Sequence, residues 1–284
     1  MDAILSTALE AAEVAAQVHL RHFGRIGLEG AQEKGQSDFV SIVDLEAQEA
    51  ALSLIHRRHP YHKILAEEGG PEGGGAWGKR RWPEEGEYLW IVDPLDGTTN
   101  YLHGHPMFGA SVGVGRKAGA EGPDQGLGPG VILEAGAVVA PRTGERWWAR
   151  RGQGAFKNGY RMRVSRLTDL GSALVGTGFP FKAPELLPRY LEEFQRVLPG
   201  SGGVRRCGSA ALDLCFLAEG ILDGFWEEAY LSPWDVMAGL LILREAGGVA
   251  TRLDGSEIDL EDGSVLAANS PRLLRDLGDL VRGR

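Results

Sequence analysis

The chain has 284 residues, which at roughly 150 residues per domain corresponds to about two compact units. Hydrophobic residues make up 43% of it and charged residues 24%, a composition typical of globular proteins that excludes the disordered and fibrous classes. The 39 acidic and 30 basic side chains give a net charge of -9, which argues against nucleic acid as a partner.

The start of the chain and its cysteines indicate the cellular compartment. Residues 2–22 carry Asp2 and Glu10 among apolar positions, which predicts an amphipathic surface helix and not a signal peptide. Because no apolar run reaches about 18 residues, no membrane span is expected. Cys207 and Cys215 form no CxxC pair, so we expect core residues and neither a disulfide framework nor a zinc site. These features together predict a cytoplasmic protein.

Two histidine pairs have a spacing that a metal site could use, His19 with His22 and His103 with His105. Neither pair has a third nitrogen or thiol ligand at a suitable distance along the chain. We therefore expect these histidines to be solvated or to cap helices.

Up to about residue 165, periodicity and turn residues predict a mixture of helices and an antiparallel sheet. Residues 88–92 (YLWIV) have no polar interruption, which is typical of a strand buried on both faces, and Pro94 is expected to end it. Alternating segments at 107–165 predict a meander with a hairpin tip at 118–130. The other expected elements are helices at 2–22 and 44–59, strands at 39–43 and 63–66, and a loop at 69–87.

After about residue 165 the pattern changes to alternating strands and helices. The sequence therefore predicts an N-terminal α+β domain over 1–165, which carries most metal-binding motifs, and a C-terminal α/β domain over 166–284. We expect the boundary to be a change of topology and not a flexible linker. The C-terminal elements are expected at 172–177 (strand), 184–198 (helix), 207–220 (helix), 223–227 (strand), 233–246 (helix) and 264–269 (strand).

The DPLDGTT segment combines the residues that a metal and phosphate site needs. Asp93 and Asp96 leave the end of a buried strand on one tight turn, a geometry that favours cations. Pro94 fixes the backbone, and Gly97 allows the backbone to approach a ligand closely. Thr98 suits the first turn of a helix, whose free N–H groups attract an anion. One turn thus offers metal ligands and a binding place for phosphate.

Carboxylates occur at three further places. Glu67 and Glu68 follow the strand-like KILA, where two like charges are costly unless a cation compensates them. Asp235 stands at the start of a strongly apolar helix, where capping is the alternative role. Asp38 and Asp44 are an even number of residues apart, so both project from one face if that stretch is a strand. A solvated face is the alternative for this last pair.

All these ligands are oxygens, which selects a hard ion such as Mg²⁺ or Mn²⁺ over zinc or copper. Two cations that share Asp93 would stabilise both the attacking and the leaving oxygen of a phosphate monoester. The helix N-terminus would neutralise the phosphoryl oxygens. Hydrolysis of a phosphate monoester therefore fits the motif set.

The chain resembles the inositol monophosphatase family of lithium-sensitive, magnesium-dependent phosphatases, and the resemblance spans nearly its whole length. It implies an α/β fold of the sugar phosphatase type, a layered αβαβα sandwich, assembled as a homodimer. It also implies two Mg²⁺ ions and allows a third, weaker ion. The motifs are DFVSIVD at 38–44, AEE at 66–68, WIVDPLDGTTNY at 90–101, GSAALD at 208–213 and WDVMAGLLILREAGG at 234–248.

The resemblance assigns the metal ligands. Glu67, Asp93 and the Leu95 carbonyl would hold the first ion, and Glu67 would also neighbour the third. The second ion would be held by three carboxylates, those of Asp93, Asp96 and Asp235.

The resemblance also assigns the catalytic and phosphate-binding groups. Thr98, assisted by Asp44, would orient the attacking water and help to deprotonate it, with Glu67 as a further member of the catalytic set. The amides of Gly97 and Thr98 would hold the phosphate. Asp38 belongs to the first motif, and Lys34, four residues before it, stands for the basic residue that the family has ahead of this motif.

On the leaving-group side, family members bind polyol hydroxyls through residues that correspond here to Asp96, Ser209, Ala210 and Glu227. The EEAYLSPWD segment is one residue longer than the usual spacing, so counting back from its tryptophan and aspartate selects Glu228 instead. We prefer Glu227 because it continues the expected strand.

The leading hypothesis is a phosphatase that acts on myo-inositol 1-phosphate or a similar small sugar phosphate. The same chemistry would suit fructose 1,6-bisphosphate, histidinol phosphate or adenosine 3',5'-bisphosphate. A different class of function, binding to the transcription machinery, is attributed to some bacterial relatives of the family. The complete catalytic set favours the enzyme, with such binding as a second role.

Overall fold

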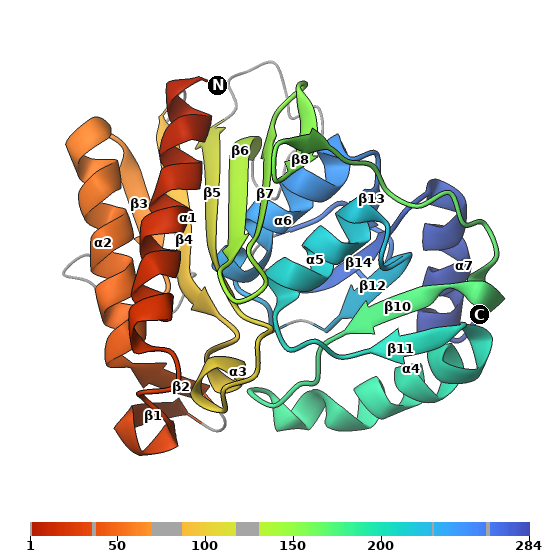
Figure 1. The fold of residues 1–284 in the computed structure, drawn as a ribbon. Helices are drawn as coiled ribbons and strands as arrows, with labels where there is room; N and C mark the ends of the chain where they lie inside the picture. Colours follow the sequence, from red (N-terminus) through yellow and green to blue (C-terminus); the bar gives the residue numbers. More distant parts are fainter. Residues whose placement is uncertain (1, 36–37, 70–86, 118–130, 229, 260–261) are drawn as a thin grey trace.

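The computed structural model describes residues 2–35, 38–69, 87–117, 131–228, 230–259 and 262–284. Its helices are α1 (Ala3–His22), α2 (Ile42–Arg58), α3 (Thr98–Leu102), α4 (Leu187–Gly200), α5 (Ala210–Glu219), α6 (Pro233–Glu245) and α7 (Pro271–Arg282). Helices and sheets alternate in five layers (Figure 1): α1 and α2, a large sheet, α5 and α6, a smaller sheet, and α4 with α7. The expected αβαβα sandwich is thereby confirmed.

The larger sheet has seven strands in sequence order, and only its first pair is parallel. The expected antiparallel meander is present from β5 onward. The strands are β3 (Lys63–Ala66), β4 (Tyr88–Asp96), β5 (Gly109–Lys117), β6 (Val131–Ala140), β7 (Glu145–Arg150), β8 (Gly154–Lys157) and β9 (Tyr160–Arg161). The expected loop at 70–86 and the hairpin tip at 118–130 lie outside the described residues.

The smaller sheet has the strand order β11-β10-β12-β14-β13, with parallel pairs on both sides of β10. Its strands are β10 (Leu174–Thr177), β11 (Gly203–Arg205), β12 (Gly224–Glu227), β13 (Val249–Thr251) and β14 (Val265–Ala268). The predicted domain boundary near residue 165 falls between the last strand of the larger sheet and the first strand of this one. It stays a prediction, because α5 and α6 contact strands of both sheets.

Two expectations about the N-terminal elements need correction. The strand expected at 39–43 is present but ends earlier: β2 (Asp38–Ser41) pairs with β1 (Ala31–Gly35), and α2 begins at Ile42. The cause is a capping box, in which the Ser41 side chain accepts from the helix backbone and Asp44 accepts from the Ser41 backbone N–H. Pro94 does not end β4 either, because the pairing with β5 is irregular between Asp93 and Asp96 and needs no donor at that point.

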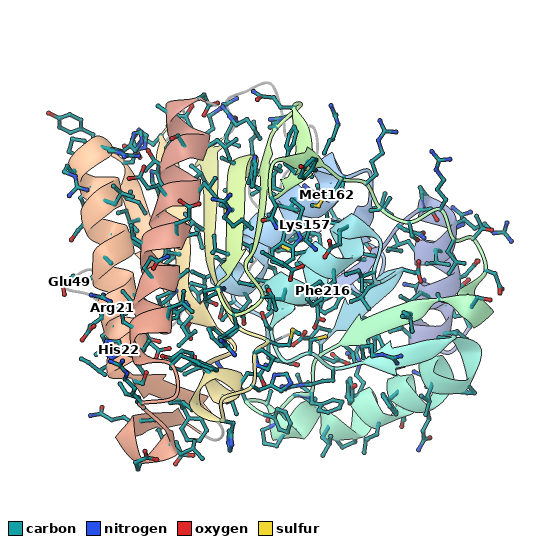
Figure 2. The ribbon with its side chains drawn as sticks, viewed as in Figure 1. Arg21, His22, Glu49, Lys157, Met162 and Phe216 are labelled. Carbon is teal, nitrogen blue, oxygen red and sulfur yellow. The ribbon has the colours of Figure 1, made fainter. Side chains whose placement is uncertain are left out.

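Charged side chains lie on the outside of the helices and apolar side chains face the core (Figure 2). Arg21, His22 and Glu49 lie on the outer side of α1 and α2. Phe216 of α5 points inward, where its ring meets Trp147 of β7 edge to face, with 5.9 Å between the centroids. On the other face of the sheet, α1 presents small buried residues, which let it lie close to β5 and β6: Ala8, Ala11, Ala12, Ala15 and Ala16.

Helix α6 lies close against glycines of the larger sheet. A Cβ at Gly136 of β6 would be 2.9 Å from the Ala238 carbonyl oxygen, and one at Gly113 of β5 would be 2.9 Å from Met237 Cγ. On the opposite side of the helix, a Cβ at Gly239 would be 2.7 Å from Leu214 of α5. Close packing therefore fixes the position of α6, whose first turn carries Asp235.

Replacing Gly136 by alanine tests this packing. The added methyl group meets backbone atoms that cannot move aside alone, so we expect Gly136→Ala to lower the free energy of unfolding by about 1–3 kcal/mol. The matched control is Gly171→Ala, where the nearest atom to the new Cβ is 3.6 Å away. Urea denaturation measures both, and equal stabilities for the two variants would contradict the packing argument.

Candidate active site

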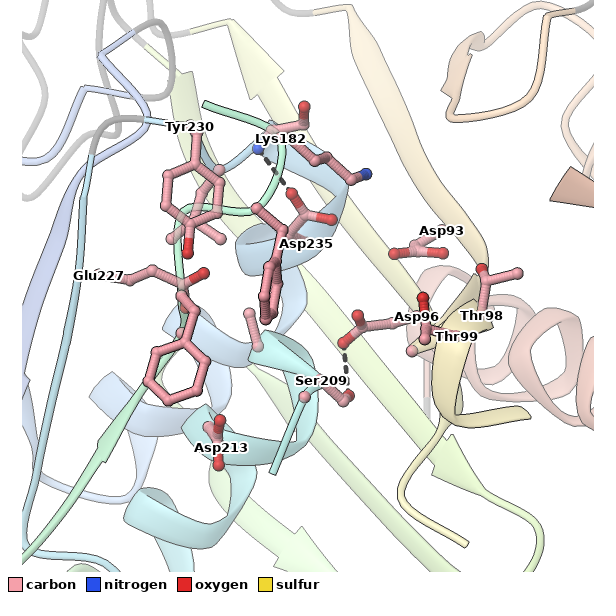
Figure 3. Close-up of a pocket in the computed structure, with 18 of the residues that line it drawn as sticks. Asp93, Asp96, Thr98, Thr99, Lys182, Ser209, Asp213, Glu227, Tyr230 and Asp235 are labelled. Atoms are coloured by element: carbon pink, nitrogen blue, oxygen red, sulfur yellow. Dashed lines mark hydrogen bonds between the residues drawn. The ribbon is translucent and has the colours of Figure 1, made fainter. Parts of the chain in front are cut away.

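A pocket of about 400 Å³ opens where the end of β4 meets the first turns of α5 and α6. This volume lies within the range of small-molecule sites, roughly 300–1,000 Å³. Figure 3 shows its two ends, with Asp93 and Thr98 at one end and Glu227 and Tyr230 at the other. Asp96 and Asp235 lie between them, so residues far apart in the sequence line one cavity.

A local hydrogen bond and a left-handed glycine fix the shape of the turn at the end of β4. The Leu95 N–H donates to Asp93 Oδ1 over 3.0 Å, which fixes that carboxylate. Gly97 precedes α3 with a φ of 87°, a left-handed conformation that favours glycine. A side chain there would also collide, since its Cβ would be 2.9 Å from the Met107 carbonyl oxygen. The predicted need for glycine at this turn therefore has a geometric reason.

Three carboxylates meet at the centre of the pocket. One oxygen each from Asp93, Asp96 and Asp235 lies within 4.8 Å of the others. Burial, followed by the charges of the neighbouring carboxylates, raises the pKa of Asp93 and Asp235 well above the usual range, and burial raises that of Asp96 to about 6. Glu67, which also lines the pocket, contributes to the repulsion at all three. An all-oxygen cluster with this unfavourable charge fits a hard divalent cation.

Asp96 is held from the second part of the chain. Its Oδ2 accepts from the Ser209 hydroxyl over 2.5 Å (Figure 3) and from the Ala211 N–H over 2.8 Å. The Ser209 hydroxyl also accepts from the Leu212 N–H and so caps α5. Ser209 and Ala210, to which the resemblance gives a role in substrate binding, both line the pocket, and the Ser209 hydroxyl is engaged with Asp96.

Asp44 and Thr98 are brought together, as the resemblance implied. The Thr98 hydroxyl lies 3.1 Å from Asp44 Oδ1 and 3.0 Å from the Leu95 carbonyl oxygen. Asp44 is fully buried in the first turn of α2, and burial raises its pKa. Asp38 and Asp44 do not share one face of a strand, because the condition for it is not met: Asp44 lies in helix α2. The side chains of Asp38 and Lys34 lie outside the described part of the structure.

His19 was expected at the surface and is instead buried under the turn that carries the aspartates. Its Nε2 lies 2.7 Å from the Pro94 carbonyl oxygen, and burial lowers its pKa to about 4. The ring is therefore neutral, with the proton on Nε2 donated to that carbonyl. The Tyr101 hydroxyl donates to the His19 carbonyl. Sequence reasoning missed this residue because its partner is 75 positions away.

Glu227 and its neighbour Glu228 lie in different surroundings. Glu227 lines the pocket, and burial raises its pKa to about 7, while the Tyr230 hydroxyl points toward it (Figure 3). Glu228 is buried behind the pocket against Glu193 of α4. Arg189 Nε lies 3.0 Å from Glu228 Oε1 and 3.2 Å from Glu193 Oε1. Of the two residues, only Glu227 lies where a substrate could reach it.

The carboxyl pair behind the pocket gives a pH dependence. Burial and the adjacent Glu228 raise the pKa of Glu193 to about 8 from an ordinary value of 4.5. Between these values the folded state holds more protons than the unfolded state, so the free energy of unfolding falls as the pH rises from about 4.5 to about 8. We expect Glu193→Gln to make this decrease shallower.

Urea denaturation at intervals from pH 5 to pH 9 measures how steeply the free energy of unfolding falls as the pH rises. Glu192→Gln is the matched control, because Glu192 neighbours Glu193 on α4 but is exposed. If the free energy of unfolding depended on pH equally in both variants, the inferred interaction between the buried Glu193 and Glu228 would be contradicted.

Several pocket residues were not predicted as site residues. These are Lys182, Arg206, Asp213 and Tyr230. Asp213 had a signal, since it ends the GSAALD motif. Lys182 and Arg206 stand in segments without a recognisable motif, and only the fold brings them to the pocket.

A buried carboxylate cluster beside a threonine–aspartate pair, in an αβαβα sandwich, defines a metal-dependent phosphatase. The sequence pattern of the inositol monophosphatase family matches residues 1–282 of the chain. The chain belongs to this family.

Named relatives and a solved structure agree with this assignment. The chain is 40% identical over 265 residues to a fructose-1,6-bisphosphatase/inositol-1-monophosphatase of Aquifex aeolicus, covering 92% of this chain and 90% of that one. It is 38% identical over 273 residues to the Nus factor SuhB of Pseudomonas aeruginosa, covering 95% and 93%. The crystal structure of the extragenic suppressor protein suhB of Bartonella henselae superimposes with a TM-score of 0.84 at 32% identity, covering 99% of each chain.

Proposed function

We propose that the protein is a magnesium-dependent phosphomonoesterase that hydrolyses myo-inositol 1-phosphate or a similar small sugar phosphate to the alcohol and inorganic phosphate. The observation that carries the proposal is the convergence of Asp93, Asp96 and Asp235 within 4.8 Å of one another in a pocket that also holds Glu227. Two Mg²⁺ ions, with room for a third near Glu67 and with Mn²⁺ as a substitute, match the oxygen ligands. We further propose a homodimer located in the cytoplasm.

In this proposal the ligands divide into two sets that share Asp93. Glu67, Asp93 and the Leu95 carbonyl hold one ion, and the three clustered aspartates hold the other. When bound, the ions stabilise the charge that develops on the attacking and leaving oxygens. The amides of Gly97 and Thr98, at the start of α3, bind the phosphoryl oxygens.

Thr98 and Asp44 position the attacking water. The Thr98 hydroxyl lies 3.1 Å from Asp44 Oδ1, which can accept its proton while the threonine oxygen accepts a proton from water. Asp44 is itself fixed by the Ser41 backbone N–H at 2.8 Å and by the Ser41 hydroxyl at 2.7 Å. The helix cap therefore also sets the geometry of the proton transfer.

Substitution of Asp93 by asparagine tests the metal assignment. Asp93→Asn removes a ligand that both ions share, so we expect release of phosphate from myo-inositol 1-phosphate with Mg²⁺ to fall at least about a hundredfold, equivalent to about 3 kcal/mol of transition-state stabilisation. The variant should also lose the rise in melting temperature that Mg²⁺ produces in the unmodified protein.

The control is Asp276→Asn, which removes one charge from the exposed side of α7. Near-normal turnover of Asp93→Asn would contradict the metal assignment. A protein that releases no phosphate from any sugar phosphate in the presence of Mg²⁺ would contradict the proposed function itself.

Gly178, just after β10, leaves room for the Glu227 carboxylate. An added Cβ would overlap that carboxylate and displace it. We expect Gly178→Ala to raise the KM for myo-inositol 1-phosphate about tenfold and to change kcat little, because the metal ligands stay in place. Steady-state kinetics beside Gly171→Ala measures the effect, and an unchanged KM would show that Glu227 does not bind the leaving group.

A second candidate function is binding to the transcription machinery. It is favoured by the name of the Pseudomonas aeruginosa relative, a Nus factor. Such binding would use the outer surface of the protein and not the carboxylate cluster. The Asp93→Asn variant separates the two functions, because it would lose hydrolysis and retain the interaction.

A further inference from the structure

A lysine to which the proposed reaction gives no role, Lys182, lies among the carboxylates of the pocket. It lines the pocket together with Asp96, Asp235 and Glu227. Figure 3 shows its side chain reaching from the segment after β10 over the centre of the pocket, with its nitrogen between Asp235 and Asp93 in this view. The ammonium group is therefore placed near the groups that would react.

The charge of Lys182 acts on carboxyl groups of the leaving-group side. Burial raises the pKa of Asp96 to about 6, that of Asp235 well above its usual range and that of Glu227 to about 7, and Lys182 partly offsets each of these shifts. Asp96 and Asp235 are proposed ligands of the second ion, and Glu227 is the proposed contact of the alcohol. The oxygen that joins phosphorus to the alcohol would lie between these groups, where Lys182 also reaches.

The attacking water belongs to the other side of the phosphorus atom. Thr98, which would orient this water with Asp44, lies at the opposite end of the pocket from Glu227 (Figure 3). In a phosphoryl transfer the attacking and the leaving oxygens are roughly in line, on opposite sides of phosphorus. Because Lys182 acts on Glu227 and on ligands of the second ion, it faces the leaving oxygen.

The backbone that carries Lys182 is held in place. The Phe181 N–H donates to the Phe179 carbonyl over 2.7 Å in the turn just before it. The Phe179 ring in turn meets Tyr190 of α4 edge to face, with 5.6 Å between the centroids. The turn is thus tied to the core, and the exposed four-carbon stem of Lys182 extends from it to the carboxylates.

Bound cations would change what this ammonium group faces. Two divalent ions would neutralise the charge of the four carboxylate ligands, Glu67, Asp93, Asp96 and Asp235. The partner that then remains for the ammonium group is the phosphate of the substrate. A lysine ammonium is a compact charge with three donors, which suits a single oxygen that gains charge during a reaction.

We propose that Lys182 is a further catalytic residue, whose ammonium group donates a hydrogen bond to the alcohol oxygen as its bond to phosphorus breaks. This inference rests on the proposed phosphatase function and adds a residue that stabilises the leaving group. The oxygen of the attacking water forms a bond to phosphorus and passes a proton through Thr98 to Asp44, which later returns it to solvent. The electron pair of the broken bond goes to the alcohol oxygen. The hydrogen bond from Lys182 stabilises this charge until the oxygen takes a proton from solvent.

The experiment measures kcat and KM with Mg²⁺ for two monophosphates that differ in the leaving group, myo-inositol 1-phosphate and 4-nitrophenyl phosphate. An alkoxide concentrates its charge on oxygen, whereas 4-nitrophenolate spreads it over the ring and needs less help. We expect Lys182→Gln to lower kcat for the inositol compound by about 10- to 100-fold with little change in KM, and kcat for the nitrophenyl compound much less. Lys182→Arg, which keeps the charge and its donors, should recover part of the loss.

Lys63→Gln is the matched control, because it makes the same chemical change outside the pocket lining. Lys63 begins β3, and its Nζ lies 2.6 Å from Glu87 Oε2 in an exposed ion pair. We expect this variant to leave kcat unchanged for both compounds.

The outcomes distinguish the two proposals. An equal fall in kcat for both compounds would mean that Lys182 acts on the phosphoryl oxygens that they share, and a rise in KM alone would mean that it only binds the substrate. Either result, or an unchanged kcat for the inositol compound, overturns the assignment and leaves the phosphatase function standing. If the unmodified protein hydrolyses only the inositol compound, the division of the effect between kcat and KM decides. If it hydrolyses neither compound, both proposals fail.

Discussion

Repulsion among buried carboxylates is the constraint around which the site is built. Asp93 and Asp96 are buried, Asp235 is half-buried, and the three carboxylates face one another, which raises the pKa of all three. The fold keeps them close by giving each one a backbone donor, from Leu95, Ala211 and Ser232 respectively. Two of these donors belong to the second part of the chain. The cluster can therefore form only when both parts are folded against each other.

The sequence was sufficient to predict the centre of the site because its signals are local. Pro94 and Gly97 mark a turn after a strand without polar residues, and Asp235 follows a proline at the start of a helix. Such signals depend on neighbouring residues alone, and they locate a strand end or a helix start. Helix α7 also had a local signal that was overlooked, since Ser270 caps it, Pro271 is its first residue, and Leu273 and Leu277 are four apart.

The residues that could not be predicted depend on contacts between distant segments. His19 is buried only because α1 crosses the turn at Pro94. Arg206 reaches the pocket only because Phe179 and Phe181 support its guanidinium. The helical start at Ile42 was also missed, because an apolar run such as FVSIV suits a strand as well as the first turn of a helix. The capping box formed by Ser41 and Asp44 favours the helix over the strand from Ile42 onward.

The close packing of α6 between the two sheets has a consequence for ion selectivity. Asp93 lies near the end of β4, which is paired on both sides, while Asp235 is carried by a helix whose backbone touches the sheet and whose glycine touches α5. A larger ion such as Ca²⁺ would require the carboxylate oxygens of Asp93 and Asp235 to move apart. Because α6 is closely packed, this would displace the layer formed by α5 and α6 and not a single loop. With the proposed Mg²⁺ ions bound, discrimination by ionic radius would thus depend in part on small residues that lie deep in the core, well away from any ligand.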